Sequence, residues 1–516
     1  MEHPTINDLP NEVLEMIFDH LEAGDLNDAS LVCRRWSALA FSERQMDRVK
    51  LVPTFPWDKD LLQGNRKYRH LKLKDTEKCS TFVDELLPMF DISSLRIRDN
   101  CLSHSSLVSI FLNAPNLQHL SIRFEPKPMS NFYGSLPVMR KLEHLEIMYA
   151  RKRAVPWHTI APSLQRLKMF CESEDQLKQW RFFSVQLKQV YVTCSKSNVL
   201  NRFCEMTFPL LEELSIKSEL SVNRYKHDFF RRHEFFRRNT SLRRLRLDGF
   251  QLSKTLVQDI TNNSKKLTSL EIIGLDNEYG SNCELGALES LGQLSELKHL
   301  RLKNLDTRIF LGCEALTSLQ SFSFDLESCD FEDVGLHERL LVLLKDLFKI
   351  APQLSCLEFG SVLTMTESVQ FICNHFTKLT RLQLRYGLSR DCLSRIDRLP
   401  HLSYLELTFM NANRYYISII PENKVRCLTL HLGEIYDEEY LLQLPEVFPQ
   451  LDRLNFVLFY KGLRESTVDR LRQSFRRCTI KIYVTVFDRY FEQKGCRIWH
   501  KSDMMSVWEK EWVWKK

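Results

Sequence analysis

The sequence predicts an α/β protein in which a short N-terminal helical module precedes a long solenoid of repeating strand-and-helix units. The first observation is the pattern apolar-x-x-apolar-x-apolar, which recurs along most of the chain. The second is a pair of short amphipathic segments before the repeats begin. The third is the scarcity of glycine: 15 residues in a chain of 516 argue against a fold built on many tight hairpins.

The composition is that of a folded soluble chain, with 44% hydrophobic and 27% charged residues. A formal net charge of +6 is weak for this length and does not by itself indicate a nucleic-acid partner. The fifteen cysteines are scattered, and the start MEHPTINDLP does not resemble a signal peptide. We therefore expect reduced thiols in the cytoplasm or nucleus. We expect no membrane span, because no apolar run is long enough.

The stretch before the repeats has the spacing of short amphipathic helices. Pro10 suits the first turn of a helix, and Gly24 is a natural stop. Apolar residues follow helical spacing on both sides of that glycine: Val13, Leu14, Ile17, Phe18 and Leu21, then Leu26, Ala29, Val32, Cys33 and Trp36. A third short helix is expected within residues 42–50. Such a small core gains stability from a partner that covers apolar surface.

The order of these residues carries a family resemblance. LPNEVLEMIFDHL followed by DLNDASLVCRRW resembles an F-box, over about 45 residues. The resemblance implies a three-helix module that docks on the Skp-type adaptor of a cullin–RING ubiquitin ligase. The residues implied in or near that interface are Leu9, Pro10, Val13, Leu14, Ile17, Phe18, Leu26, Leu31, Val32 and Trp36. The alternative is an ordinary helical cap on a solenoid, whose apolar stripes form only its own core.

The repeats begin after a linker that includes PTFPWDKDLLQGN. Typical units are Leu117/Leu120/Ile122, Leu142/Leu145/Ile147 and Leu164/Leu167/Met169. Fourteen intervals separate Ile92 from Leu451, a mean period of about 26 residues, which is typical of leucine-rich repeats. Alternating apolar residues predict a short strand with one buried face. Stacked units then form a horseshoe with parallel strands on the concave face and helices on the convex face.

These patterns divide the chain into four parts. They are the F-box at 5–50, a linker at 51–66, an array of about 16 leucine-rich repeats at 67–484, and a Trp-rich cap or tail at 485–516. Trp499, Trp508, Trp512 and Trp514 lie in the last part, which either caps the final repeat or offers an aromatic patch to a client.

Two basic regions are candidates for recognition of a client. Polar strand positions would face the concave side, and their basic members are Arg244, Arg246, Arg301, Lys303, Arg381 and Arg385. Their charge favours an acidic client. Residues 224–238, RYKHDFFRRHEFFRR, mix basic and aromatic side chains and would suit an acidic or phosphorylated motif, or RNA. The structural alternative is an amphipathic convex helix that buries Phe229, Phe230 and Phe236.

The sequence contains no catalytic motif, no metal-spaced Cys/His cluster and no sign of a cofactor. We therefore expect a non-catalytic, substrate-recognition adaptor subunit of an SCF-type ligase, which reaches the cullin and RING subunits through the Skp-type adaptor. In that interpretation the repeats bind a protein client, without a membrane or nucleic acid. The alternatives are an interaction scaffold that does not promote degradation and an RNA-linked binding protein.

Overall fold

The computed structural model divides the chain into two compact units, Met1–Leu220 and Ser221–Lys516. It describes residues 5–21, 23–52, 68–73, 87–97, 104–124, 136–149, 157–219, 230, 234–274, 283–305, 307–325, 335–360, 366–384, 393–412, 420–421, 423–435, 438–458, 462–475 and 477–484. The predicted Trp-rich part at 485–516 therefore lies outside the described residues, as do Arg385 and Phe229. Among the helices described, none combines the length and hydropathy that a membrane span requires.

The first unit begins with a helical module. It contains a 3-10 helix, η1 (Ile6–Asp8), and the helices α1 (Asn11–Phe18), α2 (Ala23–Ser30), α3 (Arg34–Ala40) and α4 (Glu43–Met46). The predicted second helix is thus two helices, because Cys33 is extended and its sulfur accepts the N–H of Trp36 as the N-cap of α3. Gly24 was expected to stop a helix, but it lies in the first turn of α2.

Eight parallel strands follow among the described residues of this unit. They are β1 (Lys50–Leu51), β2 (His70–Leu73), β3 (Ser94–Ile97), β4 (His119–Phe124), β5 (His144–Tyr149), β6 (Arg166–Cys171), β7 (Gln189–Cys194) and β8 (Glu213–Ser218). Each strand pairs with the next, and the leucines stay in register: Leu120 lies beside Leu95 and Leu145. These leucines are buried, so the predicted one-sided strand is confirmed.

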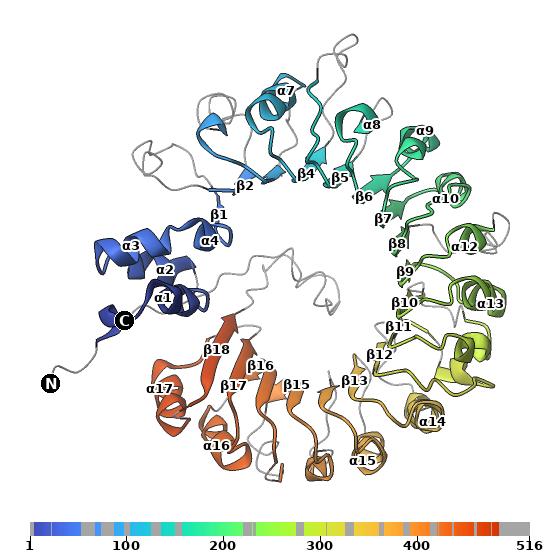
Figure 1. The fold of residues 1–516 in the computed structure, drawn as a ribbon. Helices are drawn as coiled ribbons and strands as arrows, with labels where there is room; N and C mark the ends of the chain where they lie inside the picture. Colours follow the sequence, from blue (N-terminus) through green and yellow to red (C-terminus); the bar gives the residue numbers. More distant parts are fainter. Residues whose placement is uncertain are drawn as a thin grey trace. The chain divides into compact units, whose positions relative to one another are not determined.

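Helices cover the other face of these strands. Figure 1 shows α7 (His104–Asn113), α8 (Trp157–Ile160), α9 (Glu174–Lys178) and α10 (Ser197–Cys204) on the outer side of the strands of the first unit. Two 3-10 helices, η2 (Leu87–Met89) and η4 (Gln179–Phe182), complete it. Large side chains such as Trp157 and Trp180 fill the space between helices and strands.

The second unit repeats this architecture. Its strands are β9 (Arg244–Asp248), β10 (Ser269–Ile273), β11 (His299–Lys303), β12 (Ser321–Asp325), β13 (Cys356–Phe359), β14 (Arg381–Leu384), β15 (Tyr404–Ala412), β16 (Cys427–Ile435), β17 (Arg453–Leu458) and β18 (Thr479–Val484). They pair in parallel, each with the next. The predicted final unit through Ile480 and Ile482 is β18.

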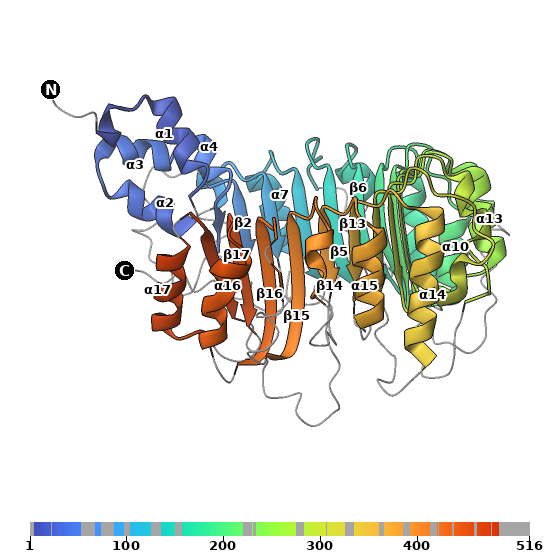
Figure 2. The same cartoon turned by 90° about the horizontal axis from the view of Figure 1, so that it is seen from below.

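The convex helices of the second unit vary in length. The longest is α14 (Gly335–Ile350), and the others are α12 (Phe235–Arg238), α13 (Lys254–Asn263), α15 (Thr366–His375), α16 (Leu444–Val447) and α17 (Glu465–Ser474). Among the described residues, the connections of this unit also contain the 3-10 helices η5 (Glu289–Gln293), η6 (Thr307–Phe310), η7 (Ile396–Arg398) and η8 (Glu439–Gln443). Figure 2, like Figure 1, shows α16 and α17 lying over one face of β16 to β18. The leucine-rich-repeat architecture predicted from the period is confirmed.

Candidate functional site

The N-terminal module has a small core of its own. Leu14 and Phe18 of α1, Leu26 and Ala29 of α2, and Leu39 and Ala40 of α3 are buried together. Leu9, Leu21 and Trp36 pack against this core, and the Trp36 ring meets Phe18 edge-on at 5.4 Å between centroids. Three of the residues expected at an interface, Leu14, Phe18 and Leu26, therefore act within the module and hold its helices together.

Arg35 connects the two sequence segments that carry the F-box resemblance. Its guanidinium donates to the carbonyl oxygens of Asn7 and Leu9, both at 2.5 Å, and to Oδ1 of Asn11 at 2.7 Å. These bonds tie α3 to the turn that begins α1. Because arginine has five donors in a rigid fork, one side chain can satisfy all three acceptors.

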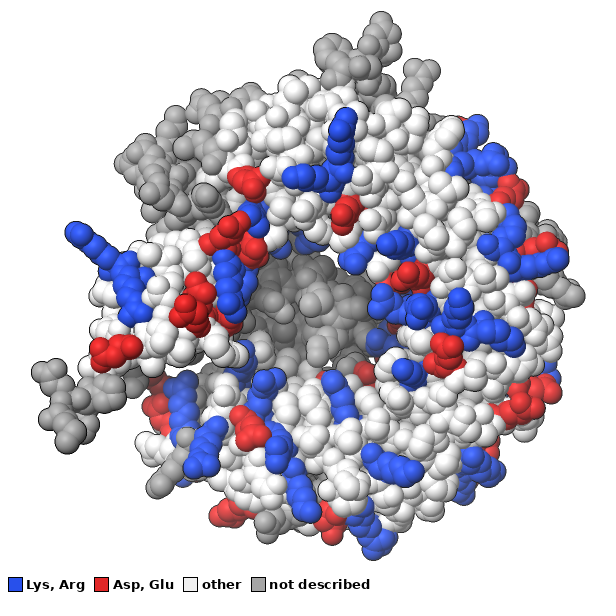
Figure 3. Space-filling view, viewed as in Figure 1, with Lys and Arg blue, Asp and Glu red and all other residues white. Residues whose placement is uncertain are grey.

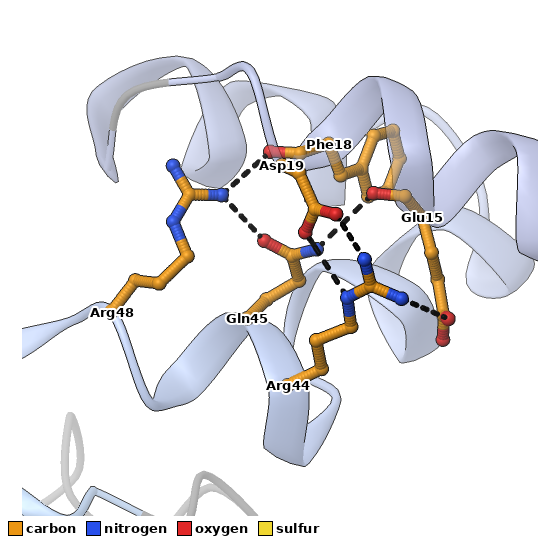
Figure 4. A network of polar contacts seen from close by, with 6 residues as sticks. All are labelled: Glu15, Phe18, Asp19, Arg44, Gln45 and Arg48. Atoms are coloured by element: carbon orange, nitrogen blue, oxygen red, sulfur yellow. Dashed lines mark hydrogen bonds and ion pairs between the residues drawn. The ribbon is translucent and has the colours of Figure 1, made fainter.

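A second polar network joins α4 to the end of α1, as Figure 4 shows. Gln45 is buried and donates to Oδ1 of Asp19 at 2.8 Å, while Arg48 donates to the carbonyl oxygen of Phe18 at 3.0 Å and to that of Leu21 at 2.8 Å. Phe18 ends α1, where its carbonyl oxygen also accepts the N–H of Leu21 at 3.0 Å, and Leu21 follows the helix. The hydrogen bond from Gln45, with help from Arg44, lowers the pKa of Asp19. The network fixes the orientation of α1.

Several apolar side chains of the module lie outside this core and remain exposed. On α1, Val13 and Ile17 are each 37% exposed and Met16 is 61% exposed; their spacing places them on one helix face. In the turn between α2 and α3, Leu31 is 77% and Val32 58% exposed. Pro10 is also exposed, while Leu9 and Trp36 are half-buried. We call Val13, Met16, Ile17, Leu31 and Val32 the exposed apolar set.

Comparison with known families identifies this module. The family model described as F-box-like matches residues 6–49. Residues 6–49 form an F-box-like domain. Its bounds agree with the helices η1 to α4, and the match includes every position that the sequence placed in or near the adaptor interface. The roles of those positions in binding stay predictions.

Comparison with solved structures finds repeat proteins of low sequence identity. A chain of the Rad7 and Elc1 complex from yeast is 14% identical, with 93% of this chain and 98% of that chain covered and a TM-score of 0.42. A leucine-rich-repeat protein of Leptospira interrogans is 14% identical, with 84% and 100% covered and a TM-score of 0.34. A Listeria monocytogenes internalin is 13% identical, with 80% and 90% covered and a TM-score of 0.26. A search of curated protein sequences finds no match.

The basic strand residues of the second unit are partly neutralised by their neighbours. Arg246 pairs with Asp248 at 3.3 Å and with Glu271 at 3.4 Å, and Glu271 also pairs with Arg301 at 3.7 Å. Figure 3 shows acidic side chains among the basic ones over β9 to β11. The predicted client surface is therefore less basic than its arginines alone suggest.

The other members of that predicted set differ in their surroundings. Arg244 is exposed, and the guanidinium of Arg381 lies over the ring of Tyr404, 4.0 Å from its centroid. Lys303 is only 8% exposed, so little of it is available to a partner. Arg385 lies outside the described residues.

The described part of the basic-aromatic segment has a structural role. Phe230, Phe235 and Phe236 are fully buried, and Phe230 also meets Phe250 at 5.5 Å between centroids. The sequence predicted burial of Phe230 and Phe236 but not of Phe235. Of the basic residues, Arg237 is exposed and pairs with Glu234 at 3.0 Å. The described aromatics thus form core and leave no stacking surface for RNA bases.

The solvent-facing side of the strands in the first unit contains a hollow of about 290 Å³. It extends over β3 to β7, and Lys50 of β1 also lines it. Arg96, Glu146 and Lys168 occupy one cross-strand row, and His119, His144 and Arg166 another. Glu146 accepts from Lys168 at 2.6 Å, from Ser121 at 2.8 Å and from Arg96 at 3.4 Å. We call this site the basic hollow.

Two histidine rings meet edge-to-face in the basic hollow, with the His119 and His144 ring centroids 4.0 Å apart and an angle of 82° between their planes. Burial, with the charges of His119 and Arg166, lowers the pKa of His144 to about 4. Burial also lowers the pKa of His119, and the charges of His70 and Arg166 add to this, while Glu143 opposes them. Both imidazoles are therefore neutral near pH 7, and each has one N–H donor.

The lowered pKa of His144 predicts acid sensitivity of the first unit. The unfolded histidine takes up a proton near its ordinary pKa of about 6.5, whereas the folded one does so near 4. The free energy of unfolding should therefore fall as the pH drops through this window. After allowance for solvent screening, the His144 contribution is about 1–2 kcal/mol. Urea denaturation at both ends of the window, followed by hydrogen exchange in β4 to β6, measures it.

In His144→Gln, the fall in the free energy of unfolding between the two pH values should be smaller by about 1–2 kcal/mol. The exposed His401, in the second unit, provides a matched control, and His401→Gln should behave like the wild type. Equal pH dependence in His144→Gln and the wild type would show that this histidine does not contribute.

The basic hollow cannot be predicted from the pattern of any single repeat. Its signal is the repetition of one residue type at one position, since His119 and His144 both precede the first leucine of a strand in neighbouring units. Among the residues described, no group of His, Cys, Asp and Glu has the arrangement of a metal site. Burial raises the pKa of Cys171 well above its usual range and that of Cys194 to about 12, which keeps both thiols protonated.

Proposed function

We propose that this chain is a non-catalytic substrate-recognition subunit of a cullin–RING ubiquitin ligase of the SCF type. The F-box-like domain would dock on a Skp-type adaptor, and through it on the cullin and RING subunits. The repeat array would bind a protein client in the cytoplasm or nucleus. No cofactor takes part in this role.

One observation carries the proposal: a domain that matches the F-box-like family leaves its exposed apolar set uncovered. Leu31 and Val32 lie in a turn, where they add nothing to the core of the domain. Apolar side chains in such positions are typical of protein interfaces. The exposed apolar set refines the residues expected from the sequence, because it retains Val13, Ile17, Leu31 and Val32 and adds Met16.

In this role the chain contributes proximity and no chemistry. Holding a client near the conjugating enzyme turns an encounter between free proteins into a reaction within one assembly, at a raised effective concentration. The parallel repeats suit this task, because their solvent-facing rows present a long series of polar side chains on a rigid support.

Capture from cells tests the proposed function. The tagged full chain and its Val32→Asp variant would be isolated with their partners. The intact chain should retain the adaptor, cullin and RING subunits, while the variant should retain only clients. Replacement of the wild type by the variant should also lengthen the half-lives of those clients.

Client half-lives that do not change would contradict the degradative role. They would favour the alternative of an interaction scaffold that does not promote degradation. Capture of the cullin by both forms would instead show that Val32 lies outside the adaptor interface.

A further inference from the structure

The basic hollow of the first unit has more positive charge than its own carboxylate can neutralise. Lys50, Arg96, Arg166 and Lys168 line it, whereas Glu146 is the only acidic residue of the described part of the chain that does so. Both oxygens of Glu146 are engaged, one by Lys168 and the other by Arg96 and Ser121. Burial alone would raise the pKa of Glu146, but these partners outweigh it and the pKa is lowered. Glu146 therefore holds Arg96 and Lys168 in place as a permanent anion.

The surplus charge is concentrated on two side chains. Among the residues that the structure describes, neither Arg166 nor Lys50 makes an ion pair with a carboxylate. With both histidines neutral, the lining has three more cations than anions. A surplus of that size attracts a doubly charged group more strongly than it attracts a single carboxylate.

The hydrogen-bond donors of the basic hollow also match an anion with several acceptor oxygens. Arg166 offers a planar fork of N–H groups, which suits the bidentate geometry of phosphate. The neutral ring of His144 has one N–H donor and carries no charge that must be desolvated, whereas the ring of His119 is also engaged by the backbone of Ser93. A volume of about 290 Å³ lies near the lower end of ligand pockets and is large enough for one phosphorylated side chain.

We propose that the basic hollow binds a phosphorylated side chain of the client, with Arg166 and Lys50 as its principal charge partners. This inference rests on the proposed role of the repeats as the client-binding surface. It places that contact in the first unit, whereas the sequence placed it on basic strands of the second. Glu146 and the histidine pair are positioning and donor groups in the same site.

Fluorescence anisotropy with the purified full chain tests the proposal. The probe is a labelled glycine-serine peptide with one phosphoserine, and its comparisons are the same peptide with serine or glutamate. The phosphopeptide should bind most tightly, and inorganic phosphate should compete with it. Arg166→Gln should weaken its binding by about tenfold or more, since hydrogen bonds to charged groups are worth about 1.5–3 kcal/mol. Lys50→Gln should also weaken binding of the phosphopeptide.

Arg453→Gln is the matched control, because Arg453 is an exposed arginine at the same strand position in β17. It should bind the phosphopeptide like the wild type. Equal binding of the serine peptide, no effect of Arg166→Gln, or no binding of any phosphate probe would overturn the proposal. Tighter binding of a single-stranded oligonucleotide, weakened by Arg166→Gln, would also overturn it and assign the basic hollow to nucleic acid.

Failure of this proposal can be separated from failure of the proposed function. Arg166 lies on β6, outside the F-box-like domain, so Arg166→Gln should bind the Skp-type adaptor normally. Loss of phosphopeptide binding with retained adaptor binding supports both proposals. Retained phosphopeptide binding without any adaptor binding would remove only the ligase role.

Discussion

Val32→Asp is expected to weaken binding of a Skp-type adaptor by about 100-fold or more while the chain stays folded. Val32 is 58% exposed in the turn between α2 and α3, so the substitution does not disturb the core of the F-box-like domain. In the complex, the new carboxylate would be buried against apolar surface without a partner, which costs several kcal/mol. Titration of the purified adaptor into wild type and variant, with circular dichroism of both, measures the effect.

Val185→Asp provides a matched control for that experiment. Val185 is 63% exposed in the first unit and lies outside the F-box-like domain, so residue type, exposure and introduced charge are comparable. It should bind the adaptor like the wild type. Equal losses in both variants would point to a general effect of the added charge, and no loss in either would exclude Val32 from the interface.

Phe236→Ala is expected to destabilise the second unit by about 3–5 kcal/mol, the usual loss for a buried phenylalanine. Phe236 is fully buried, its ring centroid lies 5.2 Å from that of Phe230, and Phe235 packs against both. Such a loss is a large part of the total stability of a typical domain. Urea denaturation, with hydrogen exchange in β9 and α13 as the local readout, measures it.

Arg237→Gln separates the structural role of this segment from a role in RNA binding. The Arg237 side chain is 70% exposed and makes one exposed ion pair, so its loss should change stability by no more than about 0.5 kcal/mol. It should not change binding to RNA at any salt concentration. If Phe236→Ala were as stable as the wild type while Arg237→Gln lost salt-dependent RNA binding, the structural assignment would be wrong.

The repeats could be predicted from the sequence because their signal is local and redundant. Each unit contains a strand with one buried face, and the alternation of apolar with polar residues predicts such a strand directly. Neighbouring units share one period, so the register of Leu95, Leu120 and Leu145 also follows from the spacing. By contrast, β1 is only two residues long, Lys50–Leu51, and lies where the predicted F-box meets the predicted linker, without a complete repeat pattern.

The break between α2 and α3 could not be predicted from helical spacing. The apolar stripe from Leu26 to Trp36 continues across it, but the backbone of Cys33 is extended, with φ −160° and ψ 168°. This break brings Leu31 and Val32 to the surface. Which apolar residues close the core and which remain for a partner depends on how three helices pack, and spacing within one helix does not contain that information.

The charge balance of the strand faces depends on contacts between repeats. Glu271 lies beside both Arg246 and Arg301, so it reduces the positive charge of a surface that the two arginines alone would predict to be basic. In the first unit, none of the carboxylates that the structure describes on the neighbouring strands forms an ion pair with Arg166. Rows of residues at one position of successive repeats therefore predict a surface better than counts of basic residues.

The heat capacity change on adaptor binding tests the central claim most directly. A purified Skp-type adaptor would be titrated into the full chain by calorimetry at several temperatures. We predict saturable one-to-one binding with a negative heat capacity change, since the exposed apolar set becomes buried. We also predict loss of that binding in Val32→Asp. Absence of binding, or binding that Val32→Asp does not change, would contradict the assignment of this face to the adaptor.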